Sequence, residues 1–551
     1  MKKFKSLTAL ILAFVMAFST VAWAAETTPE ELGLIPVRAL FEGAGGIVTW
    51  VYEDAIIHIA IDGGEIIFVP GEAIVYTGGE IFPLETGVII IGNTAFISQA
   101  DLDASIAFFV AVLSAAMGIE LVQIHLELTE EARDIVLYDF DYLVNLILEN
   151  SIWDSIIERR MGVNFDDFVA QLRAAIEAMY PVSAAVNSIL LDMFPIRGSD
   201  DPLEIAADYL TYFLLFGFSV PLMSIGHMEP RDITMYQMLL ETMVRIYYSE
   251  DMPTTDISSL FIETYTHPQA VWFYGEFEID MDSDDFPFPQ IPDNIVTEIL
   301  VPGEVAYLGI RSFLSDPDYD DLVTLPFLQE IQDFDNLIID IRGNLGGLAM
   351  YFNTYILRRL ISEPTEIASF QFITGGEVAL RWAEAFAGTG ATFSPEMDGI
   401  SQPVYAQIIP VADFLSERNM PYLNQSDLER LEYVMVSRTL YHPAPDSINF
   451  QGNIWLLVDE FSMSASPLAA LALLYADMAT IVGENTSGVM GVLHSYSVLP
   501  QTGMIFRIDI GFVTDAYGRS LEVYGITPHV RNFPGMDALQ TVLALIEESL
   551  S

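Results

Sequence analysis

Apolar and polar residues alternate between residues 33 and 100, and this is the first regular pattern of the chain. Runs such as AIIHIAID and GGEIIFVPGE place apolar residues at every second position, and pairs of glycines separate the runs. A period of two is typical of β-strands, and the glycines indicate tight turns. The pattern predicts a small all-β domain at residues 26–100.

The period changes to three or four residues in the next part of the chain, residues 101–250. In LYDFDYLVNLILENSIWDSIIERRMGVNF the apolar residues recur at this spacing and acidic residues fill the opposite face, which predicts an α-helical domain. The most apolar stretch, residues 210–226, contains Gly217 and Pro221. A membrane span needs roughly 20 apolar residues, so we interpret this stretch as a buried helix followed by a turn.

Residues 251–300 include acidic and proline-rich runs such as MDSDDFPFPQIPD, which indicate a connecting segment. From residue 301 to residue 551, short apolar strands such as NLIIDIR and NIWLLVD alternate with helical stretches, a pattern typical of an α/β domain. The predicted fold class is therefore multidomain, with an all-β N-terminal domain, a helical middle region and an α/β core.

The first 24 residues contain lysines, then an apolar run, then small residues that end in Ala22-Trp23-Ala24. This order is typical of a secretory signal peptide. We therefore expect an exported protein, either secreted or associated with the cell surface. The chain has no cysteine, so no disulfide contributes to its stability.

The charge of the chain is strongly negative, with 77 acidic and 22 basic residues. All three lysines, Lys2, Lys3 and Lys5, lie in the predicted signal peptide, so the remaining chain has 19 arginines, no lysine and a formal charge of −58. A surface of this charge repels nucleic acid and anionic membrane faces.

Candidate chemistry lies in two turns that follow strands. RGNLGG (342–347) places glycines at a strand end, where backbone N–H groups can face a ligand. DEFSMSASPLAALALL (459–474) places three serines between a strand and an apolar helix, with Ser466 as the expected N-cap and Pro467 as the first helical residue. A serine beside a helix N-terminus is a suitable nucleophile, although three serines can also form a simple capped turn.

Five motifs together resemble the tail-specific, or C-terminal-processing, serine peptidases and the related tricorn core peptidase. They are VAYLGIRSF (305–313), IIDIRGNLGG (338–347), LLVDEFSMSAS (456–466), ATIVGENTSG (479–488) and YGITPHV (524–530). The resemblance implies a ClpP/crotonase-like core built as a ββα superhelix, a polypeptide substrate, and no metal or organic cofactor. The region from PVRALFE (36–42) to GNTAFIS resembles a copper-amine-oxidase N-terminal-like domain, so cell-wall association is a further hypothesis.

The resemblance also assigns roles in the predicted site. The middle serine, Ser464, is the nucleophile, and the oxyanion donors are the N–H of Ala465 and that of a glycine in the first turn, Gly346 or, next in order, Gly347. Two backbone donors beside a helix N-terminus would stabilise the charge of a tetrahedral intermediate.

The residue that accepts the proton of Ser464 is harder to assign from the sequence. Many family members use a lysine at the place of Val489, but no lysine follows the predicted signal peptide, and arginine stays protonated. The tricorn branch uses a Ser–His–Glu arrangement, and the matching residues here are His227 and Glu522. His494 is the competing base, and Gly226 replaces a serine that the branch has beside its histidine.

The leading hypothesis is an exported serine endopeptidase that works through an acyl-enzyme. A catalytically inactive relative that binds peptides or wall components is the first alternative, and an esterase or amidase that uses the same serine is the second. No Gly-Leu-Gly-Phe-like carboxylate loop is found between His227 and Val305, so the sequence predicts no PDZ domain and gives no basis for inferring a preference for C-terminal tails.

Overall fold

The computed structural model describes residues 121–219, 228–248, 256–275, 290–348, 350–388, 401–488 and 493–550, together with the strand residues between 34 and 98. The chain divides into two compact units, which we describe separately. The first contains Met1–Tyr138 and Phe168–Pro221, and the second contains Asp139–Asp167 and Leu222–Ser551. The predicted signal peptide lies outside the described residues.

The first unit begins with antiparallel strands at the positions where the alternating pattern predicts them. They are β1 (Leu34–Pro36), β2 (Ile47–Val51), β3 (Ile56–Ile61), β4 (Gly64–Phe68), β5 (Ile74–Thr77), β6 (Glu80–Pro83), β7 (Ile89–Ile91) and β8 (Thr94–Ser98). Strands β2 to β6 form one sheet in sequence order, and β1, β8 and β7 form another. Short connections between sequential strands explain why local pattern alone locates this sheet.

The prediction of a purely helical region at residues 101–250 needs a correction, because β9 (Leu121–Leu126) pairs with β10 (Val182–Asn187). Ile124 and Val186 of this pair are buried in one cluster with Tyr212 and Phe216. The last two residues belong to α8 (Pro202–Leu214) and to η2 (Leu215–Ser219), which together cover the start of the apolar stretch. No helix within the described ranges is both long enough and apolar enough to span a membrane.

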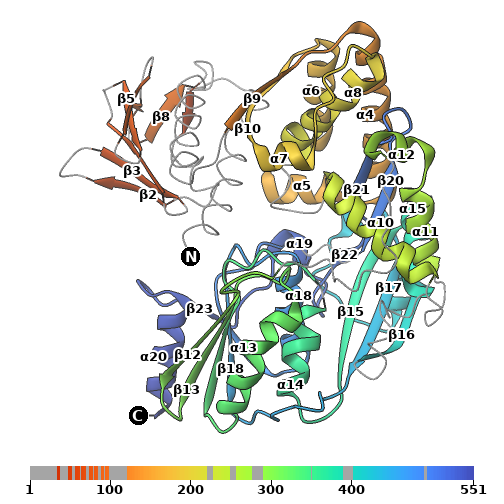
Figure 1. The fold of residues 1–551 in the computed structure, drawn as a ribbon. Helices are drawn as coiled ribbons and strands as arrows, with labels where there is room; N and C mark the ends of the chain where they lie inside the picture. The colour runs from red at the N-terminus through yellow and green to blue at the C-terminus, as the bar shows by residue number, and fades with distance from the viewer. Residues whose placement is uncertain are drawn as a thin grey trace. The chain divides into compact units, whose positions relative to one another are not determined.

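The second unit is built on a six-stranded sheet in the order β12-β13-β14-β18-β19-β23 (Figure 1). Its strands are β12 (Ile295–Val301), β13 (Val305–Ile310), β14 (Asn336–Asp340), β18 (Asn453–Val458), β19 (Ala479–Gly483) and β23 (Val530–Arg531). Strands β13 to β23 run parallel, and β12 is antiparallel at one edge. In parallel strands the carboxyl ends meet at one edge, so the turns that follow β14 and β18 emerge side by side.

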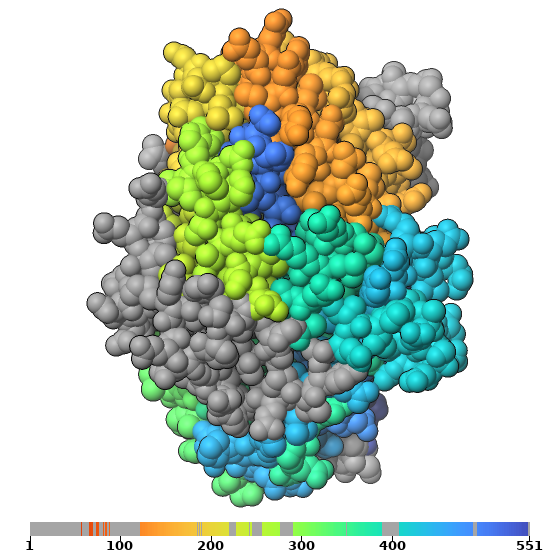
Figure 2. Space-filling model, turned by 90° about the vertical axis from the view of Figure 1, so that its right-hand side faces the viewer, coloured from red at the N-terminus to blue at the C-terminus, as the bar shows by residue number. Residues whose placement is uncertain are grey.

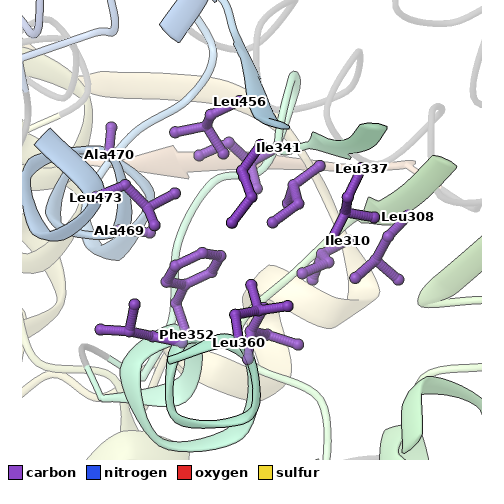
Figure 3. Packing of buried hydrophobic residues seen from close by; sticks show 14 of the residues in the cluster. Leu308, Ile310, Leu337, Ile341, Phe352, Leu360, Leu456, Ala469, Ala470 and Leu473 are labelled. Carbon is purple, nitrogen blue, oxygen red and sulfur yellow. The ribbon is translucent and has the colours of Figure 1, made fainter. Parts of the chain in front are cut away.

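Helices cover both faces of this sheet, as expected for strands without alternating polarity. On one face lie α13 (Pro317–Glu330), η3 (Asn353–Leu357), α14 (Arg358–Leu360) and α18 (Ala465–Tyr475), and on the other lies α20 (Ala538–Leu550). Figure 3 shows Phe352 and Leu360 directed toward the sheet residues Ile310 and Leu456, with Leu473 of α18 in the same core.

A second sheet, in the order β16-β17-β15-β22, and a third, in the order β11-β21-β20, complete this unit. The second contains β15 (Thr365–Thr374), β16 (Ser401–Pro410), β17 (Leu431–Tyr441) and β22 (Phe512–Val513). The third contains β11 (Glu229–Pro230), β20 (His494–Val498) and β21 (Ile505–Asp509). Four helices lie beside strands of the second sheet: α15 (Glu377–Gly388), α16 (Val411–Ser416), α17 (Gln425–Leu428) and α19 (Leu521–Tyr524).

Helices from the middle of the chain also belong here. They are α4 (Glu130–Asn150) from residue 139 onward, α5 (Trp153–Met161), α10 (Ile233–Tyr248), α11 (Asp256–Tyr265) and α12 (Pro268–Tyr274). Figure 2 shows the hairpin of β20 and β21 in blue against the yellow-green residues of α10, α11 and α12. The prediction that residues 251–300 form a connecting segment is wrong for α11 and α12, because both helices contribute buried aromatic rings.

Candidate active site

The serine turn connects β18 to α18 and holds its middle serine in an unusual backbone conformation. Ser464 has φ 57° and ψ −114° and is the N-cap residue of α18. A positive φ is uncommon for a residue with a Cβ and costs of order 1–3 kcal/mol, and such residues are frequent at functional sites. Helix α18 begins at Ala465, so the predicted N-cap at Ser466 and first helical residue at Pro467 are two residues too late.

The flanking serines have structural partners. The Ser462 hydroxyl donates to the Ile341 carbonyl at 2.9 Å, and the Ser466 hydroxyl lies 2.8 Å from the carbonyl and from Oδ1 of Asn344. Both side chains are fully buried, whereas Ser464 is half-buried. The hydroxyls of Ser462 and Ser466 therefore fasten the serine turn to the glycine turn, and Ser464 is the serine best suited to meet a substrate.

The glycine turn follows β14 and touches the serine turn directly. Gly346 has φ 94°, and a Cβ added to it would lie 2.6 Å from the Ser464 Cβ and 2.8 Å from the Ala465 nitrogen. Gly347 has φ 137°, and an added Cβ would lie 2.3 Å from the Phe313 carbonyl carbon. Only glycine fits at these two positions. The fold thus brings together Ser464, Ala465, Gly346 and Gly347, and the roles that the resemblance assigns to them stay predictions.

The backbone N–H groups of this region differ in what they bind. The N–H of Gly346 donates to Oδ1 of Asn344 at 2.8 Å, so it is engaged within its own turn. The bridge between Phe313 and Gly347 uses the Gly346 carbonyl and the Leu348 N–H, and the Gly347 N–H takes no part in it. The Ala465 N–H is the first of α18 and has no carbonyl of a preceding helical turn to bind.

Glu522 lies on α19 and is 2% exposed. Its Oε1 accepts from the Val513 N–H at 3.0 Å, and its Oε2 is buried with no hydrogen-bond partner in the part of the chain that the structure describes. Burial raises the pKa of this carboxyl well above its ordinary value, against the effects of the Val513 N–H and the Arg160 charge. A buried carboxylate oxygen without a partner is costly, so a donor is expected at this oxygen.

Two contacts place the backbone of Glu522 close to the serine turn. The Ser487 N–H donates to the Ser462 carbonyl at 3.1 Å. A Cβ added to the next residue, Gly488, would lie 2.6 Å from the Glu522 carbonyl oxygen. The turn at Ser487 and Gly488 therefore borders both the serine turn and the backbone of the predicted glutamate.

Arg160 is a residue of this region that sequence reasoning missed. From α5 its Nη1 donates to the Glu522 carbonyl at 2.6 Å, and burial lowers the pKa of Arg160 to about 10. The only sequence signal was a pair of adjacent arginines at a helix end in a chain with few basic residues.

The structure describes only one of the two histidines that are candidates for the base. His227 lies outside the described residues, and the structure resumes at Met228, which is buried. His494 has Asp509 Oδ1 at 2.6 Å from its Nδ1 and Arg507 Nη2 at 2.7 Å from its Nε2. Burial, reinforced by the charges of Arg507 and Arg231, lowers the pKa of His494 well below its ordinary value. A neutral imidazole whose lone pair already accepts from an arginine is a poor general base.

His529 has a structural partner, since its Nδ1 accepts from the Ile481 N–H at 2.9 Å. Among the described residues, no cluster of three or more histidine, aspartate or glutamate side chains could hold a metal ion.

Comparisons with known proteins identify two parts of the chain. Residues 304–532 match the model of peptidase family S41, and residues 25–112 match the copper amine oxidase N-terminal domain. No curated protein sequence matches the chain.

The solved structures that match the chain have low sequence identity and low TM-scores. A candidate peptidase from Parabacteroides merdae is 14% identical with a TM-score of 0.35, and the match covers 76% of this chain and 97% of that one. The photosystem II D1 C-terminal processing protease is 18% identical with a TM-score of 0.26, covering 44% and 47%. The tricorn protease is 14% identical with a TM-score of 0.24, covering 45% and 18%.

Both family matches coincide with the two regions in which the motifs were found. Residues 25–112 are thus similar to the copper amine oxidase N-terminal domain, and residues 304–532 are similar to peptidase family S41, a match that supports a serine-type peptidase.

Proposed function

We propose that the protein is an exported serine endopeptidase that cleaves polypeptides through an acyl-enzyme formed on Ser464. The observation that carries this proposal is the strained Ser464 at the start of α18, in contact with Gly346, a position of the glycine turn that admits no side chain. The ClpP/crotonase-like superhelix remains our proposal for the core, and wall association through the N-terminal β domain remains a hypothesis.

The first step is attack of the Ser464 hydroxyl oxygen on the substrate carbonyl. The hydroxyl proton passes to the imidazole of His227, and the carbonyl oxygen becomes an oxyanion. The Ala465 N–H and a glycine-turn N–H stabilise this charge. Gly347 is the better placed glycine, because the Gly346 N–H donates to Asn344. The imidazolium then protonates the leaving amine, and water hydrolyses the acyl-enzyme by the reverse proton path.

Glu522 is the residue proposed to orient the base. Its Oε2 has no hydrogen-bond partner among the residues that the structure describes, and an imidazole N–H is a suitable donor for it. An ionised carboxylate would also stabilise the imidazolium as it forms. The occupied ring of His494 supports His227 over His494 as the base.

The test uses the purified chain and a fluorophosphonate probe between about pH 5 and pH 9. Labelling of the wild type is expected, and Ser464→Ala should abolish it. Ser416→Ala, which changes an exposed serine on α16, is the matched control and should label normally. Absence of labelling at every pH would favour the inactive, peptide-binding alternative.

Two further measurements separate the remaining alternatives. His227→Ala should remove activity on an unfolded protein substrate, and His494→Ala should not; full activity of His227→Ala would disprove the proposed base. Comparison of activated esters with unfolded proteins distinguishes a peptidase from an esterase or amidase.

A further inference from the structure

The carboxylate of Asp320 is a buried charged group that the proposed mechanism does not use. It lies on α13 and is 3% exposed. Three side chains donate to its two oxygens. The Ser315 hydroxyl lies 3.0 Å from Oδ1, and the Asn294 Nδ2 and the Tyr351 hydroxyl lie 2.7 Å and 2.6 Å from Oδ2. Because these three donors are themselves buried, the Asp320 carboxylate holds the segments that supply them in a fixed arrangement.

One of these segments, residues 312–315, follows β13 and is held at both of its ends. At one end, the Nδ2 of Asn294 that donates to Asp320 also donates to the Ser312 carbonyl at 3.0 Å. At the other end, the Ser315 hydroxyl binds Asp320 directly. Because one carboxylate is connected to both ends, the segment has little freedom to move relative to α13.

The middle of the segment binds the glycine turn. The Phe313 N–H donates to the Gly346 carbonyl, and the Phe313 carbonyl accepts from the Leu348 N–H, both at 2.9 Å. These two hydrogen bonds flank Gly347, where an added Cβ would lie 2.3 Å from the Phe313 carbonyl carbon. The ring of Tyr351 is stacked on the ring of Phe313, with the centroids 5.1 Å apart. The position of the Gly347 backbone therefore depends on the position of Phe313.

We propose that Asp320 and Tyr351 are positioning residues for the oxyanion donor at Gly347, an inference that rests on the proposed function. The Asp320 carboxylate holds Tyr351 and residues 312–315. Phe313, in the middle of that segment, holds the backbone on both sides of Gly347. A backbone N–H stabilises an oxyanion only when it points to the place where the charge develops. Loss of this support therefore weakens the transition state more than it weakens substrate binding.

The first experiment measures kcat and KM of the full chain and of Tyr351→Phe, which removes the hydroxyl at Asp320 and keeps the ring at Phe313. The kcat per folded molecule should fall at least about tenfold with KM unchanged, since loss of a whole oxyanion donor costs about 10²–10³ in kcat. Tyr236→Phe is the matched control, because it removes a buried hydroxyl that binds the Tyr265 carbonyl at 2.8 Å, and it should keep the wild-type kcat. An equal loss in both variants, or no loss in Tyr351→Phe, would overturn the inference.

A second experiment does not depend on activity. Residue-resolved hydrogen exchange of the full chain measures the protection of the Leu348 N–H, which donates to the Phe313 carbonyl. Exchange should be roughly fivefold faster in Tyr351→Phe, because loss of one hydrogen bond shifts a local opening equilibrium by this order, and unchanged in Tyr236→Phe. Unchanged exchange in Tyr351→Phe would refute the inference.

The two experiments also separate this inference from the proposed function. An active wild type with full kcat in Tyr351→Phe rejects the positioning role alone. A wild type without any activity that depends on Ser464 rejects the proposed function, and with it the catalytic role of Gly347.

Discussion

At the scale of single residues, Gly346 has the sharpest steric requirement of the site. Gly346→Ala should place a methyl group against the Ser464 Cβ and push the nucleophile turn away from the glycine turn. We expect the rate of fluorophosphonate labelling to fall about 100-fold, because displacements near 1 Å cost this much. Gly343→Ala is the matched control, since Gly343 has φ 68° but open space around its Cβ position. Similar labelling rates for the two variants would contradict this account.

The protonation of Glu522 gives a pH prediction. Folding raises the pKa of the Glu522 carboxyl, so the native state binds more protons than the unfolded state. The free energy of unfolding therefore falls as the pH rises from the ordinary pKa of 4.5 to the native pKa. Above the native pKa this contribution is constant. Glu522→Gln should remove this decline and increase the free energy of unfolding near neutral pH. Urea unfolding at a series of pH values measures this free energy, and Glu460→Gln, which changes an exposed glutamate, is the control. A decline of equal size in Glu522→Gln would assign the effect to another group.

The family resemblance, and not residue identity alone, assigned roles to Ser464, Ala465 and the two glycines, and these roles stay predictions although the serine and glycine turns lie at adjacent strand ends. The local sequence pattern misplaced the start of α18, because the Ser466 hydroxyl binds Asn344 instead of capping the helix. Arg160 was missed because its contact with Glu522 joins residues that are distant in sequence.

At the scale of elements, Asn344 connects the turns after β14 and β18. Its Nδ2 donates to the Ile310 carbonyl at 3.0 Å, and its Oδ1 lies 2.8 Å from the Gly346 nitrogen and from the Ser466 hydroxyl. Asn344→Ala should lower the free energy of unfolding by at least about 2 kcal/mol, because it leaves buried partners unpaired. A double-mutant cycle with Ser466→Ala should give a coupling of about 1 kcal/mol.

The control cycle pairs Asn344→Ala with Ser462→Ala, because the Ser462 hydroxyl binds Ile341 instead. A smaller coupling is expected there. Equal coupling in the two cycles would show that the turns respond as a whole and that the Asn344–Ser466 contact has no particular importance.

Elements joined by short connections were predicted well, and those formed by distant segments were not. The strands of the N-terminal sheet and the strands β14 and β18 have clear local patterns. The pairing of β9 with β10 joins Leu121 to Asn187, and no local pattern encodes such a partner. Helices α11 and α12 were missed because their flanking acidic and proline-rich runs dominate the composition of residues 251–300.

At the scale of the whole molecule, the 77 acidic residues far outnumber the 22 basic residues, so the net charge is strongly negative. Many described arginines are bound to acidic side chains, as in the pairs Arg159–Asp427, Arg359–Asp321 and Arg430–Asp154. The excess carboxylates therefore set the long-range field, which attracts cations over about one Debye length. We infer that cationic polypeptides reach the site faster than anionic ones.

The measurement compares kcat/KM for two peptides with the same cleavage sequence, one flanked by lysines and one by glutamates. At low salt the cationic peptide should be preferred at least about tenfold, since steering changes association rates by this order. The preference should disappear as the Debye length falls to about 3 Å near 1 M salt. Sodium methanesulfonate is a suitable salt, because both of its ions are monovalent and screen the field of the molecule. A preference that is independent of salt would mean that contacts at the site, and not the field of the molecule, select the substrate.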